Sequence, residues 1–221
     1  FVLEAEGENM PDNKLEDISL MSFKGADLRK KKEELKYITK SEHAEMYMQF
    51  GCGNHRLLEW LDKIAEEENK YDLEGLKQEL AGKTEDFISE YLADVIAKTQ
   101  SADFHNFLHK ASVFRQPLEN TAYHKFGSDT LLNIGVGLTL FEKEQLAGQK
   151  AVFWVTPVIR AQMFDKLDES IKTEMHKTAY DLYDERLHGN ENPEPVYLEE
   201  AIHHSLESNN IRGACKYTID L

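Results

Sequence analysis

The sequence predicts a mainly α-helical protein with one short β-hairpin between residues 133 and 156. Apolar residues recur every three or four positions over most of the chain, as Leu57, Leu61 and Ile64 do. This period changes at 135–141 and 150–155, which are expected to be two strands joined by the turn EKEQLAGQ. The composition, 41% hydrophobic and 30% charged, suits helices that bury one face.

The first 98 residues are expected to form a helical unit. Residues 1–13 are expected to be extended and then looped, and the helices that follow are predicted over 24–37, 42–50, 56–68, 73–80 and 87–98. Ser41 is the expected N-cap of the second helix and Thr84 that of the last. Two acidic residues follow Thr84 in the first helical turn, where their negative charges interact favourably with the positive end of the helix dipole.

The stretch AGKTED, residues 81–86, invites comparison with a phosphate-binding loop, because glycine, lysine and threonine follow one another there. The comparison fails at Lys77, which stands where that motif needs its first glycine. The residues before Gly82 are also helical in pattern, whereas the motif needs a preceding strand. The stretch is therefore interpreted as a turn that leads into a capped helix.

Residues 99–168 are expected to form a second unit. A helix is predicted over 102–114, the two strands come next, and a further helix is predicted over 158–164. Two strands flanked by helices suggest a winged-helix unit. His105 and His109 are spaced i, i+4, which could hold a metal on one helix face, but no third ligand accompanies them at a defined spacing.

Residues 169–221 are expected to begin an array of helical repeats. One helix is predicted over 170–187, a loop with glycine and prolines breaks it, and the stretches 197–210 and 211–221 resemble an antiparallel helical pair. The middle helix carries Glu199, Glu200, His203 and His204. A metal or acid–base site is conceivable there, and a polar helix face is the alternative, so no metal ligand is assigned.

Charge and cysteine content limit the classes of partner. The chain of 221 residues has 41 Asp and Glu against 26 Lys and Arg, a formal net charge of -15, which disfavours nucleic acid and anionic membranes as partners. The longest apolar run, around 131–141, is too short to cross a bilayer. Cys52 and Cys215 form no disulfide framework, so a cytoplasmic location is predicted. The start at Phe1 suggests a piece of a longer polypeptide.

The stretch GCGNHRLLEWL, residues 51–61, places a glycine-rich turn before a strongly apolar helix. Gly51 and Gly53 indicate positive φ angles or a close approach of the backbone to another group. One interpretation is a helix start that senses a phosphate or nucleotide through its free N–H groups. The other is a tight turn between helices, with Asn54 as N-cap and Arg56 facing solvent.

The order of these pieces resembles the C-terminal half of a STAND-type regulatory ATPase, the group of signal-transduction proteins that includes the NB-ARC and NOD proteins. The matching stretches cover roughly residues 15 to 221 and are LEDISLMSFKGADLRKKKEEL, GNHRLLEWLDKI, FLHKASVFRQPLENTAY, AVFWVTPVIRAQM and DLYDERLHGNENPEPVYLEEAIHHSLESNN. The resemblance implies a helical lid of an ATPase module over 1–98, a winged helix over 99–168 and tetratricopeptide-like helices over 169–221.

The resemblance also implies where nucleotide would bind in the intact protein. The family's Gly-x-Pro box corresponds to Gly53, Asn54, His55 and Arg56, and its winged-helix phosphate contact corresponds to Thr156, followed by Pro157. His55 replaces the box proline and Thr156 replaces a histidine, so nucleotide binding could be weak or different.

The chain has no Walker A or Walker B motif, so it is not expected to hydrolyse ATP by itself. No cofactor is assigned to the chain, and ADP or ATP is expected in the intact protein only. The implied partners are an upstream ATPase core and a protein or small-molecule ligand read by the repeats.

Three functions follow as alternatives. The first is a regulatory fragment that couples nucleotide state to ligand sensing. The second is a winged-helix transcription regulator, or a helical interaction module without nucleotide. The third is a helical enzyme that uses the histidine and glutamate clusters.

Overall fold

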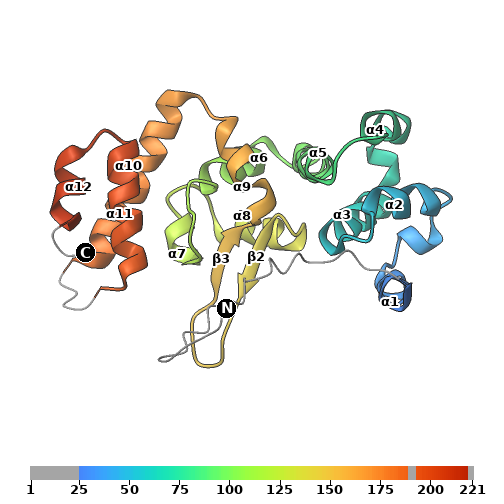
Figure 1. Ribbon diagram of the computed structural model, residues 1–221, viewed down its shortest axis with the longest axis horizontal. Coiled ribbons are helices and arrows are strands. Elements are labelled where there is room, and N and C mark those ends of the chain that lie inside the picture. The colour runs from blue at the N-terminus through green and yellow to red at the C-terminus, as the bar shows by residue number, and fades with distance from the viewer. Residues whose placement is uncertain (1–24, 189–192, 219–221) are drawn as a thin grey trace, which may run out of the picture.

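A computed structural model describes residues 25–188 and 193–218. The protein is mainly helical, with one small antiparallel sheet, and its elements follow one another along an elongated molecule, from α1–α4 at one end to α10–α12 at the other (Figure 1). The expected extended segment over 1–13 and the last residues of the helix expected over 211–221 lie outside the described residues. Within the described ranges, every helix is either too short or too polar to cross a bilayer.

The described first part of the chain is helical, as predicted. Its helices are α1 (Gly25–Glu34), α2 (Ala44–Gly51), α3 (His55–Glu66), α4 (Leu73–Leu80) and α5 (Glu85–Lys98). Asn54, Asp72 and Thr84 each accept backbone hydrogen bonds at the start of the helix that follows. The caps predicted at Asn54 and Thr84 are therefore confirmed, and α3 packs against both α2 and α5.

The cap predicted at Ser41 is wrong. The helix α2 begins at Ala44, and its N-cap, His43, makes no side-chain cap. The Ser41 hydroxyl instead accepts from the backbone N–H of His43 at 2.9 Å and donates to the carboxylate of Glu68. A serine followed by two turn residues satisfies its own local turn, which moves the helix start by two positions.

The middle of the chain combines helices with the sheet. Its elements are α6 (Ala102–Ala111), β1 (Leu118–Glu119), α7 (Asn120–Tyr123), α8 (Asp129–Gly137), β2 (Phe141–Glu144), β3 (Val152–Val155) and α9 (Pro157–Asp165). The sheet has the order β1-β3-β2, and both pairings are antiparallel. The hairpin predicted between 133 and 156 is present, and the two-residue strand β1 was not predicted.

The strand predicted over 135–141 is wrong, because residues 129–137 form α8 and the strand begins only at Phe141. The alternation of apolar and small residues there imitates a half-buried strand. Gly135 serves close packing instead, since a Cβ atom at this position would lie 2.4 Å from the ring of Phe141. Thr139, with a φ of 56°, lies in the left-handed region between the helix and the strand.

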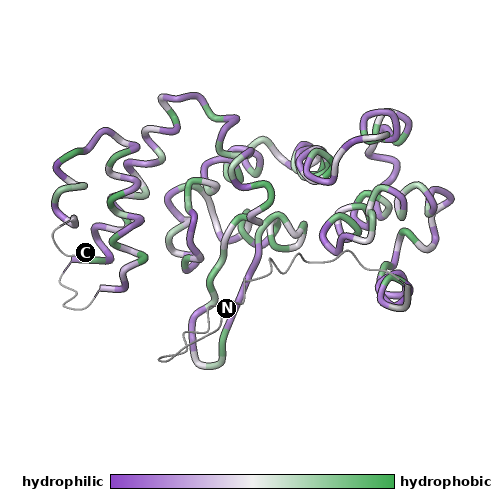
Figure 2. Tube along the Cα trace, in the orientation of Figure 1, coloured by the Kyte–Doolittle hydropathy of each residue, from purple (hydrophilic) through white to green (hydrophobic). Residues whose placement is uncertain are grey.

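The last part of the chain is helical. The helices α10 (Glu169–Leu187), α11 (Pro195–Glu207) and α12 (Ile211–Thr218) pack in sequence, each against the next. The hydropathy along the tube alternates within these helices, as it does in helices that bury one face (Figure 2). The helices predicted over 170–187 and from 197 onward are confirmed, with boundaries shifted by a few residues.

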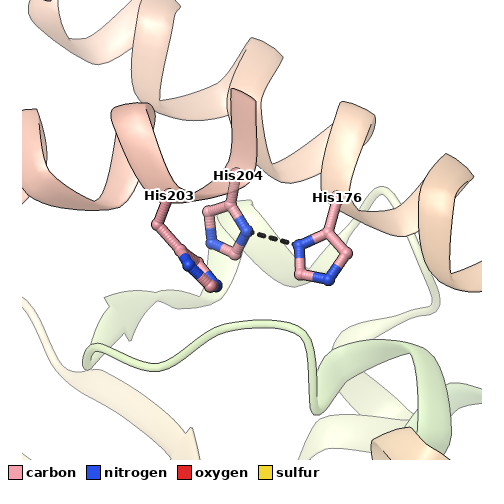
Figure 3. A group of neighbouring side chains, drawn as sticks. All are labelled: His176, His203 and His204. Carbon is pink, nitrogen blue, oxygen red and sulfur yellow. Dashed lines mark hydrogen bonds between the residues drawn. The ribbon is translucent and has the colours of Figure 1, made fainter. Parts of the chain in front are cut away.

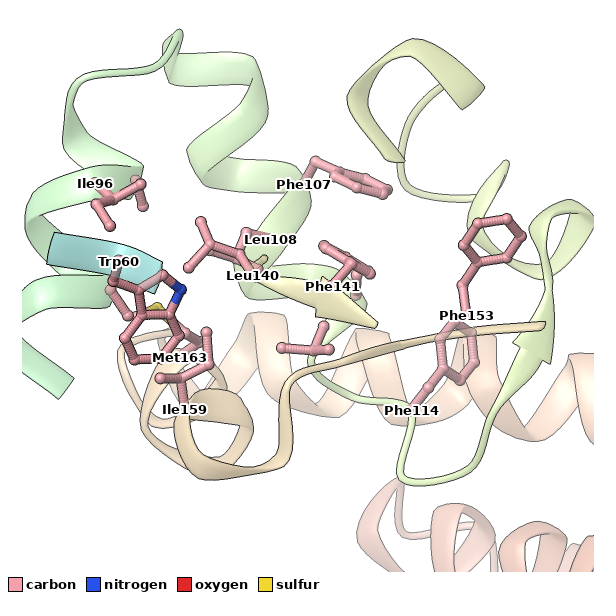
Figure 4. Close-up of a cluster of buried hydrophobic side chains, with 14 of the residues drawn as sticks. Trp60, Ile96, Phe107, Leu108, Phe114, Leu140, Phe141, Phe153, Ile159 and Met163 are labelled. Carbon is pink, nitrogen blue, oxygen red and sulfur yellow. The ribbon is translucent and has the colours of Figure 1, made fainter. Parts of the chain in front are cut away.

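One hydrophobic core connects the helical unit with the sheet. Trp60 of α3 and Ile96 of α5 lie in the same cluster as Leu108 of α6 and Met163 of α9 (Figure 4). Trp60 is fully buried. The core holds the start of α3 in a fixed position relative to the β2–β3 hairpin.

Candidate functional site

The turn before α3 is built from residues with unusual backbone geometry. Cys52 and Gly53 have φ angles of 48° and 78°, in the region that favours glycine. A Cβ atom on Gly51, the last residue of α2, would lie 2.4 Å from Leu58, so this glycine allows the end of α2 to pack closely on α3. Both expectations for the glycines are confirmed, and the group that approaches Gly51 belongs to the chain itself.

Asn54 closes the turn and starts the helix. Its side-chain oxygen accepts hydrogen bonds from the backbone N–H of Arg56 at 2.8 Å and of Leu57 at 3.1 Å. Its amide nitrogen donates to the carboxylate of Glu85, the first residue of α5. The free N–H groups at this helix start are therefore already partly satisfied by Asn54 itself.

Arg56 connects the start of α3 to the hairpin. One guanidinium nitrogen lies 3.1 Å from Glu142 on β2, and another lies 3.3 Å from Glu59, one turn along α3. The arginine side chain is 28% exposed and that of Glu142 is 29% exposed. His55 is more exposed, and its Nε2 lies 2.8 Å from Glu59. The interpretation that places Arg56 on the solvent face is wrong, because its half-buried side chain joins two parts of the molecule.

Thr156 and Pro157 lie where β3 passes into α9. Thr156 is buried, and its hydroxyl donates a 2.9 Å hydrogen bond to the carbonyl of Thr139. Its backbone N–H donates to the carbonyl of Leu140 at 3.0 Å. Pro157 is exposed and is the first residue of α9, a position that suits proline.

The six residues expected to bind nucleotide are thus held in two neighbouring places. The ladder between β2 and β3 pairs Phe141 with Val155, so Thr156 follows directly beside the strand that carries Glu142. Through Glu142, the turn at 53–56 is linked to that strand. The Thr156 hydroxyl is engaged within the hairpin, so it is not presented to a ligand in this arrangement.

A second arginine–glutamate pair joins the middle of the chain to the last helices. Arg115, after α6, contacts Glu200 of α11 through two nitrogens, at 2.8 and 3.1 Å, and the carboxylate is 2% exposed. Burial opposes ionisation of Glu200, but the neighbouring His204 and the hydrogen bonds from Arg115 outweigh it and lower its pKa to about 2. Glu200 is therefore a buried carboxylate that stays charged.

Three histidine rings lie beside this pair. His176 belongs to α10 and His203 and His204 belong to α11, and one ligand atom from each lies within 4.8 Å of the others (Figure 3). The Nδ1 atoms of His176 and His204 are 2.9 Å apart. Sequence reasoning singled out His203 and His204 but missed His176, because it lies on another helix and no periodicity links it to them.

The second histidine pair, His105 and His109, lies on α6. The rings of His105 and His109 are 4.2 Å apart between centroids, on the single helix α6. Burial lowers the pKa of His109 to about 4, with a smaller effect from the neighbouring His105. In the part of the chain that the structure describes, no further ligand completes a metal-binding group with them.

The AGKT stretch forms the turn between α4 and α5, as interpreted from sequence. Thr84 accepts a hydrogen bond from the N–H of Phe87 at 3.4 Å, and the Lys83 ammonium lies 4.9 Å from the centre of the Phe87 ring. This turn and α2 border a cleft of about 610 Å³, lined by charged and apolar residues that include Glu45, Phe50, Cys52 and Lys77.

Comparisons of the chain with protein-family models, with curated proteins and with solved structures found no match.

Proposed function

We propose that this chain is the regulatory part of a STAND-type signal-transduction ATPase, in which a helical lid, a winged helix and the start of tetratricopeptide-like repeats follow one another. In the intact protein these units couple the nucleotide state of an upstream ATPase core to a protein or small-molecule ligand read by the repeats. The chain itself contributes no catalytic group to ATP hydrolysis, and the intact protein works in the cytoplasm.

The topology of the middle unit supports this proposal. The order helix, strand, helix, helix, strand, strand, with the first strand paired to the last, is the order of a winged helix. The helices before it and the three packed helices after it match the order of units that the resemblance implies.

The observation that carries the functional part is the contact between Arg56 and Glu142. It joins the first turn of α3 to the hairpin, and the resemblance implies that the intact protein binds nucleotide beside these residues. An anionic ligand near this junction competes with Glu142 for the guanidinium of Arg56, since both offer oxygen acceptors to the same donor. Binding of ADP then changes the contact between the two units, which is the differential affinity that a switch requires.

The transcription-regulator alternative is less well supported. In a winged-helix topology the helix that enters the DNA groove is the third one, which here is α8, with the sequence DTLLNIGVG. This helix begins with Asp129 and carries no lysine or arginine, so it lacks the cations that contact phosphates.

The test uses the full-length gene product. Mass spectrometry of the purified protein is expected to find bound ADP, and Arg56→Ala is expected to change ADP affinity measured by calorimetry. Glu142→Gln is expected to strengthen ADP binding, because it removes the competing carboxylate. Lys83→Ala is the matched control and should leave the affinity unchanged, since Lys83 lies at the α4–α5 turn.

Absence of bound nucleotide, together with no measurable ADP binding, would refute the nucleotide part of the proposal. An effect of Lys83→Ala as large as that of Arg56→Ala would show that the AGKT turn binds the phosphate after all.

A further inference from the structure

The side chains of His176, His203 and His204 project from α10 and α11 on the same side of the helix pair (Figure 3). We propose that these three histidines bind one divalent transition-metal ion of the zinc class. The site is separate from the junction at Arg56, and it does not depend on nucleotide binding.

The distances between the rings suit one shared ion. A tetrahedral zinc ion with bonds of 2.0–2.1 Å holds its ligand nitrogens about 3.3 Å apart. The Nδ1 atoms of His176 and His204 are 2.9 Å apart, so a small opening of this pair admits the ion in place of the shared proton. The ring of His203 lies 5.0 Å from that of His204 and 5.6 Å from that of His176, between centroids.

His203 must move most. It neighbours His204 in sequence, and adjacent residues on a helix point about 100° apart. Its ligand atom nevertheless lies within 4.8 Å of those of the other two, and its side chain is only half-buried, so rotation of the ring is sterically open. Three imidazole ligands leave a fourth position for water, as in many zinc sites.

The surroundings of His204 match what zinc ligands usually have. While Nδ1 of His204 faces His176, its Nε2 lies 3.5 Å from the carboxylate of Glu200, which is held in turn by Arg115. A ligating histidine commonly gives its other ring N–H to a carboxylate, which fixes the ring orientation and raises its basicity. His204 Nε2 is buried and makes no well-formed hydrogen bond, and metal binding at Nδ1 places the ring proton on this atom, toward Glu200.

Aromatic side chains enclose two of the rings. Tyr183 stacks on His204 with 5.6 Å between centroids, and Phe164 meets the edge of His176 at 5.1 Å. A histidine binds a metal through a neutral imidazole nitrogen, and these enclosed rings present three such nitrogens to one place.

Imidazole nitrogens select ions such as Zn²⁺, Ni²⁺ and Cu²⁺ over Mg²⁺ and Ca²⁺, which prefer oxygen. A bound ion joins α10 to α11 directly. Because the ion binds only the folded arrangement, it stabilises that arrangement by mass action. The alternative occupant is a proton shared between the Nδ1 atoms of His176 and His204, and the experiment distinguishes the two.

The experiment titrates Zn²⁺ into the chain, produced without a polyhistidine tag, by calorimetry, and follows Co²⁺ binding by visible absorption. One equivalent of Zn²⁺ is expected to bind, Co²⁺ is expected to give the bands of a tetrahedral complex, and the Tm is expected to rise with Zn²⁺ concentration. Mg²⁺ is the negative control and should give no heat of specific binding.

Variants identify the ligands. His203→Gln, the least disruptive because this residue is half-buried, is expected to weaken Zn²⁺ binding at least about tenfold, and His176→Gln to abolish it. His105→Gln, which alters the other histidine pair, should bind as the parent chain does. Melting of each variant without metal identifies any that fails to fold, and the result for His203→Gln decides in that case.

The proposal is overturned if Zn²⁺ does not bind at one equivalent, or if His203→Gln and a folded His176→Gln bind it with the parent affinity. It is also overturned if His105→Gln removes the binding.

Discussion

Two arginine–glutamate pairs join distant parts of this chain, and water reaches them to different degrees. Arg56 and Glu142 are both partly exposed, at 28% and 29% of their side chains. In the other pair, Arg115 is 36% exposed but Glu200 is only 2% exposed. An exposed pair contributes little because water and salt screen it, whereas a buried carboxylate depends on every donor that contacts it. The Arg56–Glu142 pair can therefore separate at a small cost in free energy, whereas separation of Arg115 from Glu200 costs much more.

The surroundings of the two pairs reinforce this difference. The Arg56 contact lies at the edge of a junction whose stability comes from buried apolar side chains such as Trp60 and Met163 (Figure 4). The Glu200 carboxylate is held by Arg115 and lies within reach of Gln116 and His204. The Arg56 contact can therefore open without unfolding the chain, whereas the contacts of Glu200 hold α11 to the middle of the chain.

The largest effect is expected for Trp60→Ala. This side chain is fully buried, so its loss should lower the free energy of unfolding by about 3–5 kcal/mol through lost burial and a residual cavity. Chemical denaturation monitored by circular dichroism measures this value. A loss below about 1 kcal/mol would mean that apolar packing around Trp60 does not hold α3 against the middle of the chain. The contrast between the two arginine–glutamate pairs would then lose its basis.

Arg115→Ala is expected to cost about 3 kcal/mol, because it leaves the buried charge of Glu200 without its main partner. Arg115→Lys should cost less, since it keeps the charge and loses only the two-nitrogen geometry. Urea denaturation of the two variants at pH 7 provides the measurement. Equal stability of Arg115→Ala and the parent chain would contradict the weight given to this pair.

The pH dependence sharpens the comparison through two separate windows. His109 has a pKa of about 4 in the folded chain against 6.5 when unfolded, so its protonation opposes folding. Its contribution is present above pH 6.5 and is lost as the pH falls toward 4, by about 1–2 kcal/mol between pH 7 and 5. The pKa of His176 is also lowered to about 4, so its protonation destabilises the folded chain in the same pH window.

Glu200 acts in the other window. Its pKa is lowered to about 2 from 4.5, so the stability that it contributes is present above pH 4.5 and is lost as the pH falls toward 2.

The His109 prediction is tested by denaturation of His109→Gln, whose free energy of unfolding should depend less on pH between pH 7 and 5 than that of the parent chain. His188→Gln, which changes an exposed histidine, is the control. An unchanged dependence in His109→Gln would contradict the assignment.

The smallest effect on stability is expected for Arg56→Ala, below about 1 kcal/mol, since its pair is exposed to solvent. Denaturation at low and high salt measures it, and the small difference from the parent chain should shrink as salt screens the pair. A cost comparable to that of Arg115→Ala would remove the distinction between the two pairs.

Local signals in the sequence determined much of the helical structure. The caps at Asn54 and Thr84, the apolar face of α3 and the boundaries of α4 follow from residues within one or two helical turns of each other. These features depend on backbone hydrogen bonding and on periodicity, which a short stretch of sequence specifies by itself. The mainly helical class, with one hairpin before residue 156, was predictable for the same reason.

Tertiary structure alone decided the features that rest on contacts between distant residues. Gly135 lies in a helix and packs against the ring of Phe141, where a strand was predicted. Arg56 forms an ion pair with Glu142, and His176 of α10 lies beside His203 of α11. No propensity or spacing encodes such meetings, because each depends on how separate helices and strands pack. The sequence therefore determined where capped helices such as α3 and α5 begin, and the packing decided which side chains face each other.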